Sequence, residues 1–589
     1  MAPSATMTTF RPTHRWRQPP PTAPDGLTAI AAARGIGPRA LAVLVARGHV
    51  SAADLAAYFD DPSTSLHDPR LLPDAGPLLR RVREAVTRRE RILVFGDFDA
   101  DGLTGSTILT IALRALGLDV EVHIPDRIGE GHGLSRVAVE RARSEARGLI
   151  LTVDTGTTSL AEVALAGEAG IDVIVTDHHH VPDVLPAAVA VVNPHRPGSD
   201  YPDPRLAGTG VAFKVAQLIL ADLPGGPDAA LELADLAVVG TVADMAPMVG
   251  ENRAIARLGL ARLRSHPRPG IAALLAAAGV AADSVTLESI GFTIAPRLNA
   301  GGRMGDAMTA SRLLLAATSA EAEPLAALLE AANTERRTVT GDVLAEAVEA
   351  AATSATVGGD PAIVVLGDWP VGVIGLVAGR LAERSSLPSV VVTRSVEPWR
   401  GSARSAAGFD LAAAFDECAP LFERHGGHPQ AAGCELRPGA FDRFRDRFLE
   451  LASATPALAG PELSLDLVVP ALDVDYRLQR ELAALDPLGP GAPRALVGFA
   501  GLVVGRARAA TGGHTQLTLR KGREVLDGIA FDRSDLAELA PETPVDLVGH
   551  LDSRTFGGFE SLQIEIVDAA PAGHLAVDVP RVAPLVPTR

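Results

Sequence analysis

The sequence predicts an α/β protein with a parallel-sheet domain, a second α/β domain joined to it by a long helix, and a β-barrel near the C-terminal end. Three observations predict this architecture. From about residue 90 to 195, apolar strand-like runs alternate with helical patterns, as in βαβ units. A second alternation begins near residue 362. From about 460 to 572 the pattern changes to short strands between turn residues, which is typical of a small barrel or sandwich.

In the first alternation we expect five strands separated mainly by helices. The strands lie near 92–95, 119–124, 149–153, 172–176 and 188–192, and the helices near 103–116, 135–146 and 158–168. Residues 205–350 look largely helical, and the end of this stretch predicts the long helix between the two α/β domains. In the second alternation we expect strands at 362–366 and 388–393 and helices at 373–384 and 409–422.

These patterns divide the chain into seven parts. The Pro-rich ends predict disordered tails, and the first 25 residues lack the apolar core of a secretory signal. The expected parts are a tail (1–25), an N-terminal helical module (26–80), the catalytic α/β domain (81–255), a helical region with the connecting helix (256–355), the second α/β domain (356–457), the barrel (458–572) and a tail (573–589).

The composition excludes several classes of protein. With 589 residues, 47% hydrophobic and 21% charged, the chain is expected to be globular and divided into several domains. Its net charge of −17 argues against a polybasic nucleic-acid binder, although an acidic enzyme can carry a local basic groove. The two cysteines, Cys418 and Cys434, suggest neither a disulfide framework nor a zinc site, so we expect a reducing, cytoplasmic location. No apolar run predicts a membrane span.

Four acidic clusters each follow an apolar, strand-like run. In open α/β sheets, ligands bind beyond the carboxyl ends of the strands, so clusters that are distant in sequence can meet there. We therefore expect one site that combines Asp97, Asp99 and Asp101 after 92–95, Asp154 after 149–153, Asp177, His178 and His179 after 173–176, and Asp244 after 240–243.

The residue types in these clusters point to metal-dependent chemistry. Carboxylates and imidazoles suit Mn²⁺ and Mg²⁺, which are widely used to hydrolyse phosphate esters. Taken singly, the first cluster could cap a helix, and Asp154 could lie in an ordinary turn. His180, which follows His179, could be a solvated surface residue. Burial of Asp244 in its apolar segment favours a ligand. Together the clusters predict hydrolysis of a phosphodiester or phosphomonoester by metal-activated water. The sequence contains no Gly-x-Ser-x-Gly elbow and no Walker loop.

Three Gly-rich segments further along the chain are candidates for binding the substrate. Arginine forks suit phosphate oxygens, and glycine allows close approach of the backbone. The alternative is that these segments are surface loops with solvated side chains. The candidate residues are Arg297, Asn299 and Arg303 in a Gly-rich turn, Ser402 and Arg404, and Gly426, Gly427 and His428.

The order of the clusters resembles the DHH phosphoesterase superfamily, and within it the RecJ-type single-strand-specific 5′→3′ DNA exonucleases. The matching residues are Gly96–Gly102, Val153-Asp154, Asp177-His178-His179 and Gly240–Pro247. The resemblance implies that Asp99, Asp101, Asp154, His178 and Asp244 bind two Mn²⁺ or Mg²⁺ ions, supported by Asp97 and Asp177, and that His179 contacts the scissile phosphate. Related DHH phosphatases carry a histidine where this chain has Phe95. The resemblance implies that this departure affects the occupancy or affinity of one of the two metal ions.

The resemblance extends over the rest of the chain. Gly426-Gly427-His428 is similar to the signature of the associated DHHA1 domain, which grips the substrate opposite the metals. The terminal strands correspond to an oligonucleotide-binding (OB) barrel, in which His514, Arg520, Lys521, Arg554 and Phe556 are candidate strand contacts. Trp369 could stack on a base or belong to the core.

The expected function is therefore single-strand-specific DNA exonuclease activity in repair and recombination. Within the same chemistry, the alternative is a DHH-family nano-RNase or phosphoadenosine phosphatase, although such enzymes resemble a shorter two-lobe chain. An alternative of another class is a non-catalytic DHH scaffold that binds single strands in a replication complex. The resemblance implies single-stranded DNA as the partner, with a single-strand-binding protein and a RecQ-like helicase, and we expect a monomer with no membrane association.

Overall fold

The computed structural model describes residues 10–19, 26–127, 129–354, 359–405, 408–455, 462–556 and 559–576. The described residues between 62 and 457 form one compact unit, and those before 62 and after 457 form another. Within these ranges, none of the helices combines the length and the apolar content that a membrane span requires.

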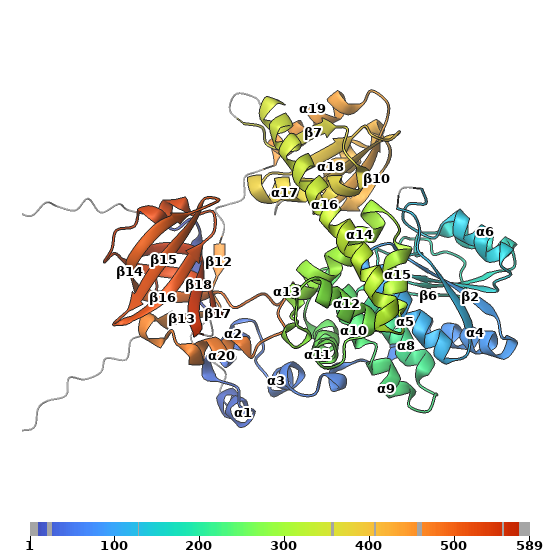
Figure 1. The fold of residues 1–589 in the computed structure, drawn as a ribbon, viewed down its shortest axis with the longest axis horizontal. Helices are drawn as coiled ribbons and strands as arrows, with labels where there is room; N and C mark the ends of the chain where they lie inside the picture. The colour runs from blue at the N-terminus through green and yellow to red at the C-terminus, as the bar shows by residue number, and fades with distance from the viewer. Residues whose placement is uncertain are drawn as a thin grey trace, which may run out of the picture. The chain divides into compact units, whose positions relative to one another are not determined.

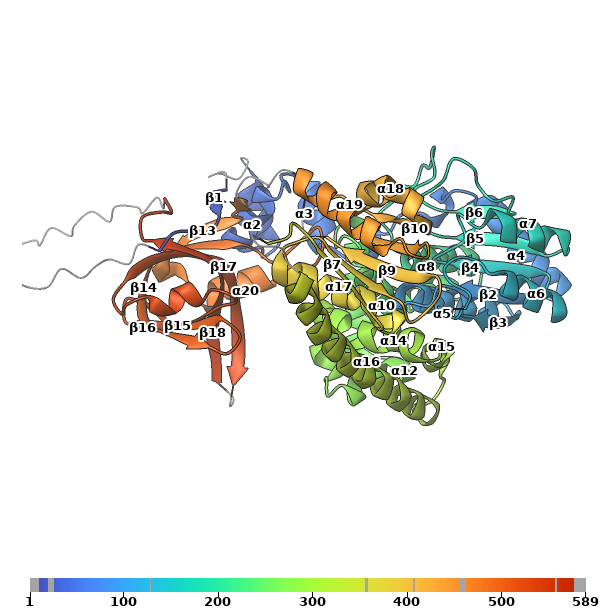
Figure 2. The ribbon, with the colours of Figure 1, turned by 90° about the horizontal axis from the view of Figure 1, so that it is seen from above.

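A five-stranded parallel sheet is the centre of the first α/β domain, as predicted (Figure 2). Its strand order is β3 (Asp119–His123), β2 (Arg91–Gly96), β4 (Leu149–Val153), β5 (Asp172–Thr176) and β6 (Ala190–Val192). Side chains of β2 alternate between two cores: Ile92 and Val94 pack into one, and Leu93 and Phe95 into the other. The central strands β2, β4 and β5 are largely apolar because helices cover both faces of the sheet, whereas the edge strand β3 carries Asp119, Glu121 and His123.

Helices from both sides of the sheet bury these two cores. The core that contains Ile92 also includes residues of α4 (Ala75–Arg88), α5 (Ala100–Ala115) and α8 (Gly208–Leu220). The core that contains Leu93 includes residues of α6 (Arg136–Ser144) and α7 (Leu160–Glu168). The expected boundary between the N-terminal module (26–80) and this domain (81–255) thus falls within helix α4, which packs into this domain as a whole.

The region between the two α/β domains is helical, as predicted. It contains α9 (Gly226–Leu231), α10 (Ala234–Ala243), α11 (Gly250–Ser265), α12 (Pro269–Ala277), α13 (Leu287–Ser289), a π-helix over Ile290–Ile294, α14 (Ala295–Met304), α15 (Met308–Leu315) and the 36-residue α16 (Ser319–Ser354). The predicted long connecting helix is α16, which contacts α12, α14 and α15 at one end and α17 (Val371–Ser385) and β7 (Ile363–Gly367) at the other (Figure 1).

Two segments that carry predicted site residues are helical, which differs from the sequence prediction. The apolar run before Asp244 is the end of helix α10 and not a strand. A short, uniformly apolar run has no periodicity that separates a buried helix from a buried strand. The expected Gly-rich turn around Arg297–Arg303 is helix α14.

The second α/β domain has a mixed five-stranded sheet. Its order is β10 (Phe422–His428), β11 (Ala431–Leu436), β9 (Trp399–Arg404), β8 (Ser389–Thr393) and β7, in which only the β7–β8 pair is parallel. Helices α18 (Leu411–Glu417) and α19 (Phe441–Ala454) contribute to one core, and α17 shares the other core with α16. Trp369 is buried in that second core and donates a hydrogen bond to Glu346 (2.8 Å), so the structure supports the core alternative for this residue.

The terminal strands form a closed barrel. The strands are β13 (Leu467–Pro470), β14 (Val497–Ala510), β15 (His514–Lys521), β16 (Glu524–Ala530), β17 (Pro544–Phe556) and β18 (Phe559–Pro571). Beyond the order β13-β14-β15-β16-β18-β17, β14 also pairs with β17, which closes the sheet. Closure removes the exposed edges that an open sheet of this kind would have.

The barrel shares its core with the N-terminal part of the chain. Residues of α1 (Leu27–Ala33), α2 (Pro38–Ala46), α3 (Ala52–Phe59) and α20 (Tyr476–Ala483) pack into it. The strand β1 (Arg15–Arg17) pairs with β12 (Glu462–Ser464). The expected tail over 1–25 is thus ordered over residues 10–19, where the fully buried Asp568 accepts hydrogen bonds from Thr13, His14 and Trp16.

The C-terminal tail that was expected over 573–589 also begins with an ordered stretch. The backbone N–H groups of Gly573 and Leu575 donate to Asp546. Residues 1–9, 20–25 and 577–589 of the two expected tails lie outside the described residues.

Candidate metal centre

The predicted acidic clusters meet at the carboxyl edge of the parallel sheet. Among the described residues, three overlapping groups have ligand atoms within 4.8 Å of one another: Asp97 with Asp99 and Asp154; Asp154 with His178 and His179; and Asp101 with His178 and Asp244. Because Gly96, Val153, Thr176 and Val192 are in register across β2, β4, β5 and β6, the loops that follow these strands leave the sheet at one edge. Asp244 reaches the same place from the C-terminal end of α10.

The loop after β2 presents its carboxylates through a helix start. Asp99 is the N-cap of α5, and its Oδ1 accepts hydrogen bonds from the N–H groups of Asp101 (2.9 Å) and Gly102 (3.1 Å). One oxygen of Asp99 therefore caps helix α5, which was the alternative role expected for this cluster. Asp101 accepts from the N–H groups of Gly208 and Thr209, both at 2.8 Å, which ties α5 to the start of α8.

Asp154 is held in an uncommon backbone conformation. Its φ of 60° lies in the left-handed region, which aspartate tolerates better than most residues. A Cβ atom on Gly208 would lie 2.5 Å from its Oδ1, so only glycine leaves room for this carboxylate. Close packing of the α8 N-terminus thus determines where the Asp154 oxygens lie.

Asp177 accepts hydrogen bonds from its own loop and from the loop after β4. It accepts from the N–H groups of His178 (2.8 Å), His179 (3.1 Å) and Thr157 (3.0 Å), and from Nδ1–H of His179 at 2.8 Å. Burial alone would raise the pKa of Asp177, but the hydrogen bonds from His179 and Thr157 hold it below its usual range. Burial is the largest single effect on His179 and lowers its pKa, but the hydrogen bond to Asp177 and the charges of Asp177 and Asp154 together raise the pKa of His179 to about 9.

The remaining carboxylates repel one another in a buried setting. Burial, together with the negative charges of neighbouring aspartates, raises the pKa of Asp101 to about 6 and that of Asp244 to about 7. The same two causes raise the pKa of Asp154 well above its ordinary value. Buried like charges of this kind are stable only when a positive charge compensates them.

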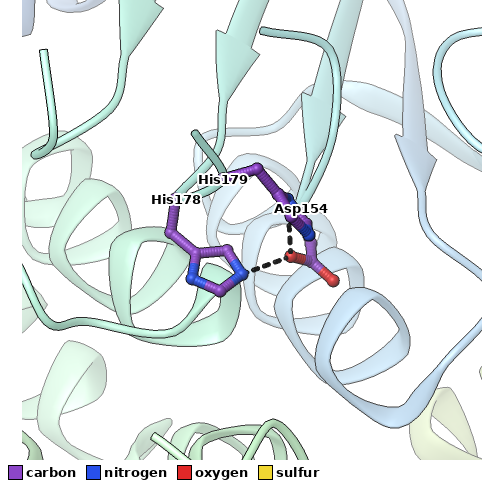
Figure 3. Close-up of side chains that lie close together, drawn as sticks. All are labelled: Asp154, His178 and His179. Atoms are coloured by element: carbon purple, nitrogen blue, oxygen red, sulfur yellow. Dashed lines mark ion pairs between the residues drawn. The ribbon is translucent and has the colours of Figure 1, made fainter. Parts of the chain in front are cut away.

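Several donor atoms at this centre lack the partners that buried polar atoms require. Asp97 Oδ1, Asp154 Oδ1 and His178 Nε2 are buried and have no hydrogen-bond partner among the described residues. His178 Nε2 lies 3.0 Å from Asp154 Oδ1, and His179 Nδ1 lies 3.8 Å from the same oxygen (Figure 3). Adjacent ligands of an octahedral ion at about 2.1 Å are about 3.0 Å apart. The donor set therefore fits a Mn²⁺- or Mg²⁺-type ion.

A loop that the sequence analysis did not single out also reaches this centre. Arg127 lies over the ring of Phe98, 4.7 Å from its centroid, and His132 Nδ1 is 3.6 Å from Asp97 Oδ2. Both residues follow β3, so they leave the sheet at the same edge as the acidic clusters. A basic residue and a Gly-flanked histidine directly after a predicted strand were the signal that could have identified them.

Arg127, Arg303 and Arg404 form a cationic group beside the carboxylates. Burial and the charges of Arg127, Arg336 and Arg404 lower the pKa of Arg303 to about 9. Burial, and then the charge of Arg127, lower that of Arg404. Within the described residues, none of Arg127, Arg303 and Arg404 lies within 4.0 Å of a carboxylate oxygen. Since guanidinium groups stay protonated, an anion would stabilise this group.

The predicted substrate-binding residues fall into different settings. Arg303 extends from α14 and donates to the Gly372 carbonyl (2.9 Å) at the start of α17. Arg404 is at the end of strand β9, not in a turn, and donates to Ser402 Oγ (3.3 Å). Arg297 is ion-paired with Glu330 of α16. Asn299 accepts from the N–H of Ala100 (2.7 Å) and thus orients the metal-site loop.

The Gly-Gly-His segment forms one side of the β10–β11 hairpin. Gly426, Gly427 and His428 are exposed and pair with Gly433, Ala432 and Ala431. Gly427 has φ 152°, and a Cβ atom there would lie 2.4 Å from the Ala431 carbonyl oxygen. The glycine is thus required by the hairpin itself.

We expect Gly208→Ala to weaken metal binding while the fold persists. The added Cβ must displace the Asp154 carboxylate, so Mn²⁺ affinity measured by calorimetry should fall by about tenfold or more, the size of effect seen when groups that orient ligands are lost. The matched control is Gly167→Ala in α7, where a Cβ meets nothing within 4 Å; it should leave Mn²⁺ affinity unchanged. Unaltered Mn²⁺ binding by Gly208→Ala would show that Asp154 is not a ligand.

Comparison with known proteins identifies the three domains. Residues 91–241 match the model of the DHH family N-terminal domain, residues 359–454 the DHHA1 domain, and residues 465–568 the RecJ OB domain. The single-stranded-DNA-specific exonuclease RecJ of Thermus thermophilus is 37% identical over 542 residues, covering 92% of this chain and 76% of the relative. The RecJ proteins of Bacillus subtilis and Escherichia coli are 35% and 34% identical, and the alignments cover 68% and 87% of their lengths.

Solved structures agree with these relatives. The crystal structure of Thermus thermophilus RecJ in complex with Mn²⁺ matches with a TM-score of 0.79 and 33% identity, over 94% of this chain and 79% of that one. The corresponding complex with Mg²⁺ matches with a TM-score of 0.75. From its domain order, its sequence identity and its fold, the chain belongs to the RecJ family.

Proposed function

We propose that this chain is a metal-dependent exonuclease that hydrolyses single-stranded DNA from its 5′ end, in DNA repair and recombination. The observation that carries this proposal is the buried group of carboxylates and imidazoles with unpartnered donor atoms, in a chain that belongs to the RecJ family. The 5′→3′ polarity is supported by the family resemblance of the sequence.

Asp99, Asp101, Asp154, His178 and Asp244 would hold two Mn²⁺ or Mg²⁺ ions, with Asp154 shared between them. This role is supported by the way Asp154 belongs to two of the three ligand groups. When bound, such ions activate a water molecule for in-line attack and neutralise the phosphate. Asp177 orients His179 through its 2.8 Å hydrogen bond, and His179 would contact the scissile phosphate.

The cationic group would hold a phosphate of the strand next to the metal centre. Arg127, Arg303 and Arg404 are half-buried, and none of them forms an ion pair with a carboxylate among the described residues. They lie close enough to one another for their positive charges to interact. Guanidinium groups bind phosphate oxygens through paired N–H donors. Ser402, next to Arg404, would add a hydroxyl, and the exposed Gly426, Gly427 and His428 of the hairpin would contact the strand further along.

The barrel would bind the strand through the outer face of β14, β15, β16 and β18. Here Arg506, Thr518, Asp527 and Gln563 are in cross-strand register and, with Arg508 and Gln516, line a cavity of about 330 Å³. OB barrels commonly bind oligonucleotides on their strand 2–3 face. Two contacts expected from the sequence are engaged elsewhere: Lys521 is buried and donates to the Val474 carbonyl, and Arg520 is ion-paired with Glu542.

The sequence analysis also named His514, Arg554 and Phe556 as candidate contacts to the strand. His514 accepts a hydrogen bond from the N–H of Asp532 and packs edge-on against Phe531. Arg554 lies on β17. The side chain of Phe556 lies outside the described residues.

We further propose a cytoplasmic monomer, a location that its two free cysteines support. A single-strand-binding protein and a RecQ-like helicase are proposed as partners on the resemblance of the sequence alone. A nano-RNase or phosphoadenosine phosphatase is disfavoured by the match of residues 465–568 to the RecJ OB domain. A non-catalytic scaffold is disfavoured by the complete set of acidic clusters at the metal centre.

Digestion of end-labelled DNA and RNA tests the proposed activity. With Mn²⁺ or Mg²⁺, we expect single-stranded DNA to lose a 5′ label as mononucleotide at once, while duplex DNA persists and EDTA stops the reaction. Asp154→Ala should lower turnover by at least about 100-fold, because loss of a ligand exceeds the loss of an orienting partner. Cleavage in EDTA, or near-normal turnover by a folded Asp154→Ala protein, would contradict the metal mechanism.

Loss of single arginines should separate phosphate binding from metal binding. We expect Arg404→Ala and Arg127→Ala each to raise KM for single strands by about tenfold or more, since one charge-assisted hydrogen bond contributes about 1.5–3 kcal/mol. Mn²⁺ affinity should stay within about twofold. Arg297→Ala is the control, because Arg297 is already paired with Glu330. An equal rise of KM in all three variants would refute a specific phosphate site.

The barrel face should contribute to the salt dependence of binding. Each phosphate contact contributes about 0.7 to the slope of log affinity against log salt for a single strand. We therefore expect Arg506→Ala and Arg508→Ala each to reduce the slope for a long oligonucleotide by about 0.7, measured by fluorescence anisotropy. Arg520→Ala should leave the slope unchanged, because Arg520 is ion-paired with Glu542. An unchanged slope in the first two variants would place the strand elsewhere on the barrel.

A further inference from the structure

Asn193 is a fully buried asparagine at the edge of the sheet where the acidic clusters lie. It directly follows β6. Thr176, the last residue of β5, pairs in register with Val192, the last residue of β6. Asn193 therefore leaves the sheet beside Asp177, which directly follows β5. A buried side-chain amide is costly unless its donors and its acceptor are satisfied, so its partners show what it holds in place.

The Asn193 side chain makes hydrogen bonds to three separate groups. Its Nδ2 donates to the carbonyl oxygen of His179 (2.9 Å) and to Thr157 Oγ1 (3.2 Å). Its Oδ1 accepts from the N–H of His195 at 2.9 Å. Because acceptors face the nitrogen and a donor faces the oxygen, these partners determine the orientation of the amide. One side chain thus connects the loops that follow β4, β5 and β6.

His179 is held through both its backbone and its ring. Its N–H donates to Asp177 Oδ1 (3.1 Å), and its Nδ1–H donates to the same oxygen (2.8 Å). The other oxygen of Asp177 accepts from the N–H of Thr157 at 3.0 Å. With the two bonds donated by Asn193, these contacts form a closed cycle of hydrogen bonds. Since Nδ1 is used within this cycle, Nε2 is the nitrogen of the half-exposed His179 ring that can contact a ligand.

An asparagine directly after a strand has a simpler explanation, which is the Asx turn. The bond between Asn193 Oδ1 and the N–H of His195, two residues further on, is such a turn. The turn uses only the side-chain oxygen, so aspartate would serve equally well. The two N–H donors of the Asn193 amide are not needed for the turn, and both go to the loops that carry His179 and Thr157. These two donated bonds point beyond a turn.

We propose that Asn193 is a positioning residue that holds His179 where its ring meets the scissile phosphate. This inference rests on the proposed exonuclease function, in which His179 contacts that phosphate. Asn193 fixes the carbonyl of His179, while Asp177 fixes its N–H and its ring. Displacement of a reacting group by about 1 Å can cost about 100-fold in rate. Asn193 therefore acts on turnover through His179 and not through the metal ligands.

Substitution of Asn193 in the full-length chain tests this role. We expect Asn193→Ala to lower kcat on single-stranded DNA with Mn²⁺ by at least about tenfold, the size of effect seen when orienting partners are lost. KM and the Mn²⁺ affinity measured by calorimetry should stay within about twofold. Asn193→Ser is a second variant, because its hydroxyl can still accept from the N–H of His195 but cannot make both donated bonds. Its kcat should fall to a similar extent.

Asn252→Ala is the matched control for loss of a buried amide. Asn252 is also fully buried, and its Nδ2 donates to the carbonyls of Arg205 and Pro247. This substitution should lower the melting temperature, as Asn193→Ala does, while kcat stays within about twofold. An equal loss of kcat in both variants would show that general destabilisation, and not the position of His179, explains the effect.

A double-substitution cycle shows through which residue Asn193 acts. If Asn193 acts through His179, adding Asn193→Ala to His179→Ala should change kcat by no more than about twofold, because residues that act as a unit are not additive. The same fold-loss in both backgrounds would overturn the proposal. A tenfold fall of Mn²⁺ affinity in Asn193→Ala would also overturn it, since the effect would then lie at the metal ligands.

The outcomes separate this inference from the proposed function. Near-normal kcat in Asn193→Ala or in Asn193→Ser, with the fold checked by circular dichroism, would overturn the positioning role and leave a metal-dependent exonuclease. Absence of DNA hydrolysis by the wild-type chain would instead refute the proposed function, and the role of Asn193 with it.

Discussion

Repulsion between buried carboxylates at one edge of the parallel sheet is the constraint on which the rest of this domain depends. Asp101, Asp154 and Asp244 each have a pKa that burial and their neighbours raise, and buried atoms of Asp97, Asp154 and His178 lack partners. Such an arrangement is unfavourable in itself and is stable with bound cations. The carboxylates at this edge of the sheet destabilise the fold because they repel one another. The apolar strands, and the helices on both faces of the sheet, compensate for this loss of stability.

The helix α8 connects this edge to the rest of the domain. Its first residue, Gly208, lies against Asp154, and its Lys214 is fully buried with Glu251 of α11, at 2.9 Å between Nζ and Oε1. Lys214 also donates to the carbonyl of His67 (2.6 Å). A buried ion pair satisfied by further hydrogen bonds favours one arrangement of its partners, because breaking it would leave an uncompensated charge. This network therefore keeps α8, and with it the Asp154 carboxylate, in one position.

Contact between the two α/β domains depends on glycines of α14 and α17. A Cβ atom on Gly302 would lie 3.0 Å from the Phe98 carbonyl oxygen, and one on Gly372 would lie 2.5 Å from that of Arg303. These close approaches bring α14 against both the metal-site loop and the start of α17. The cationic group thereby lies next to the carboxylates, so the two kinds of charge that a phosphodiester requires are adjacent in space. Glycine within a helix is unfavourable, and here it is explained by packing.

Features of the fold and of the metal site could be predicted from the sequence where they depend on residues that are close together in the chain. The sequence by itself determined the parallel sheet, the long helix, the barrel and the acidic clusters, because strand periodicity and residues at strand ends depend on neighbours in the chain. Only the tertiary structure decided that the run before Asp244 is a helix, that Arg297 pairs with Glu330, that Lys521 is buried, and that helices α1, α2 and α3 pack with the barrel. It also brought Arg127 and His132 to the metal centre. These outcomes depend on contacts between residues far apart in the chain, which leave no periodic trace in the sequence.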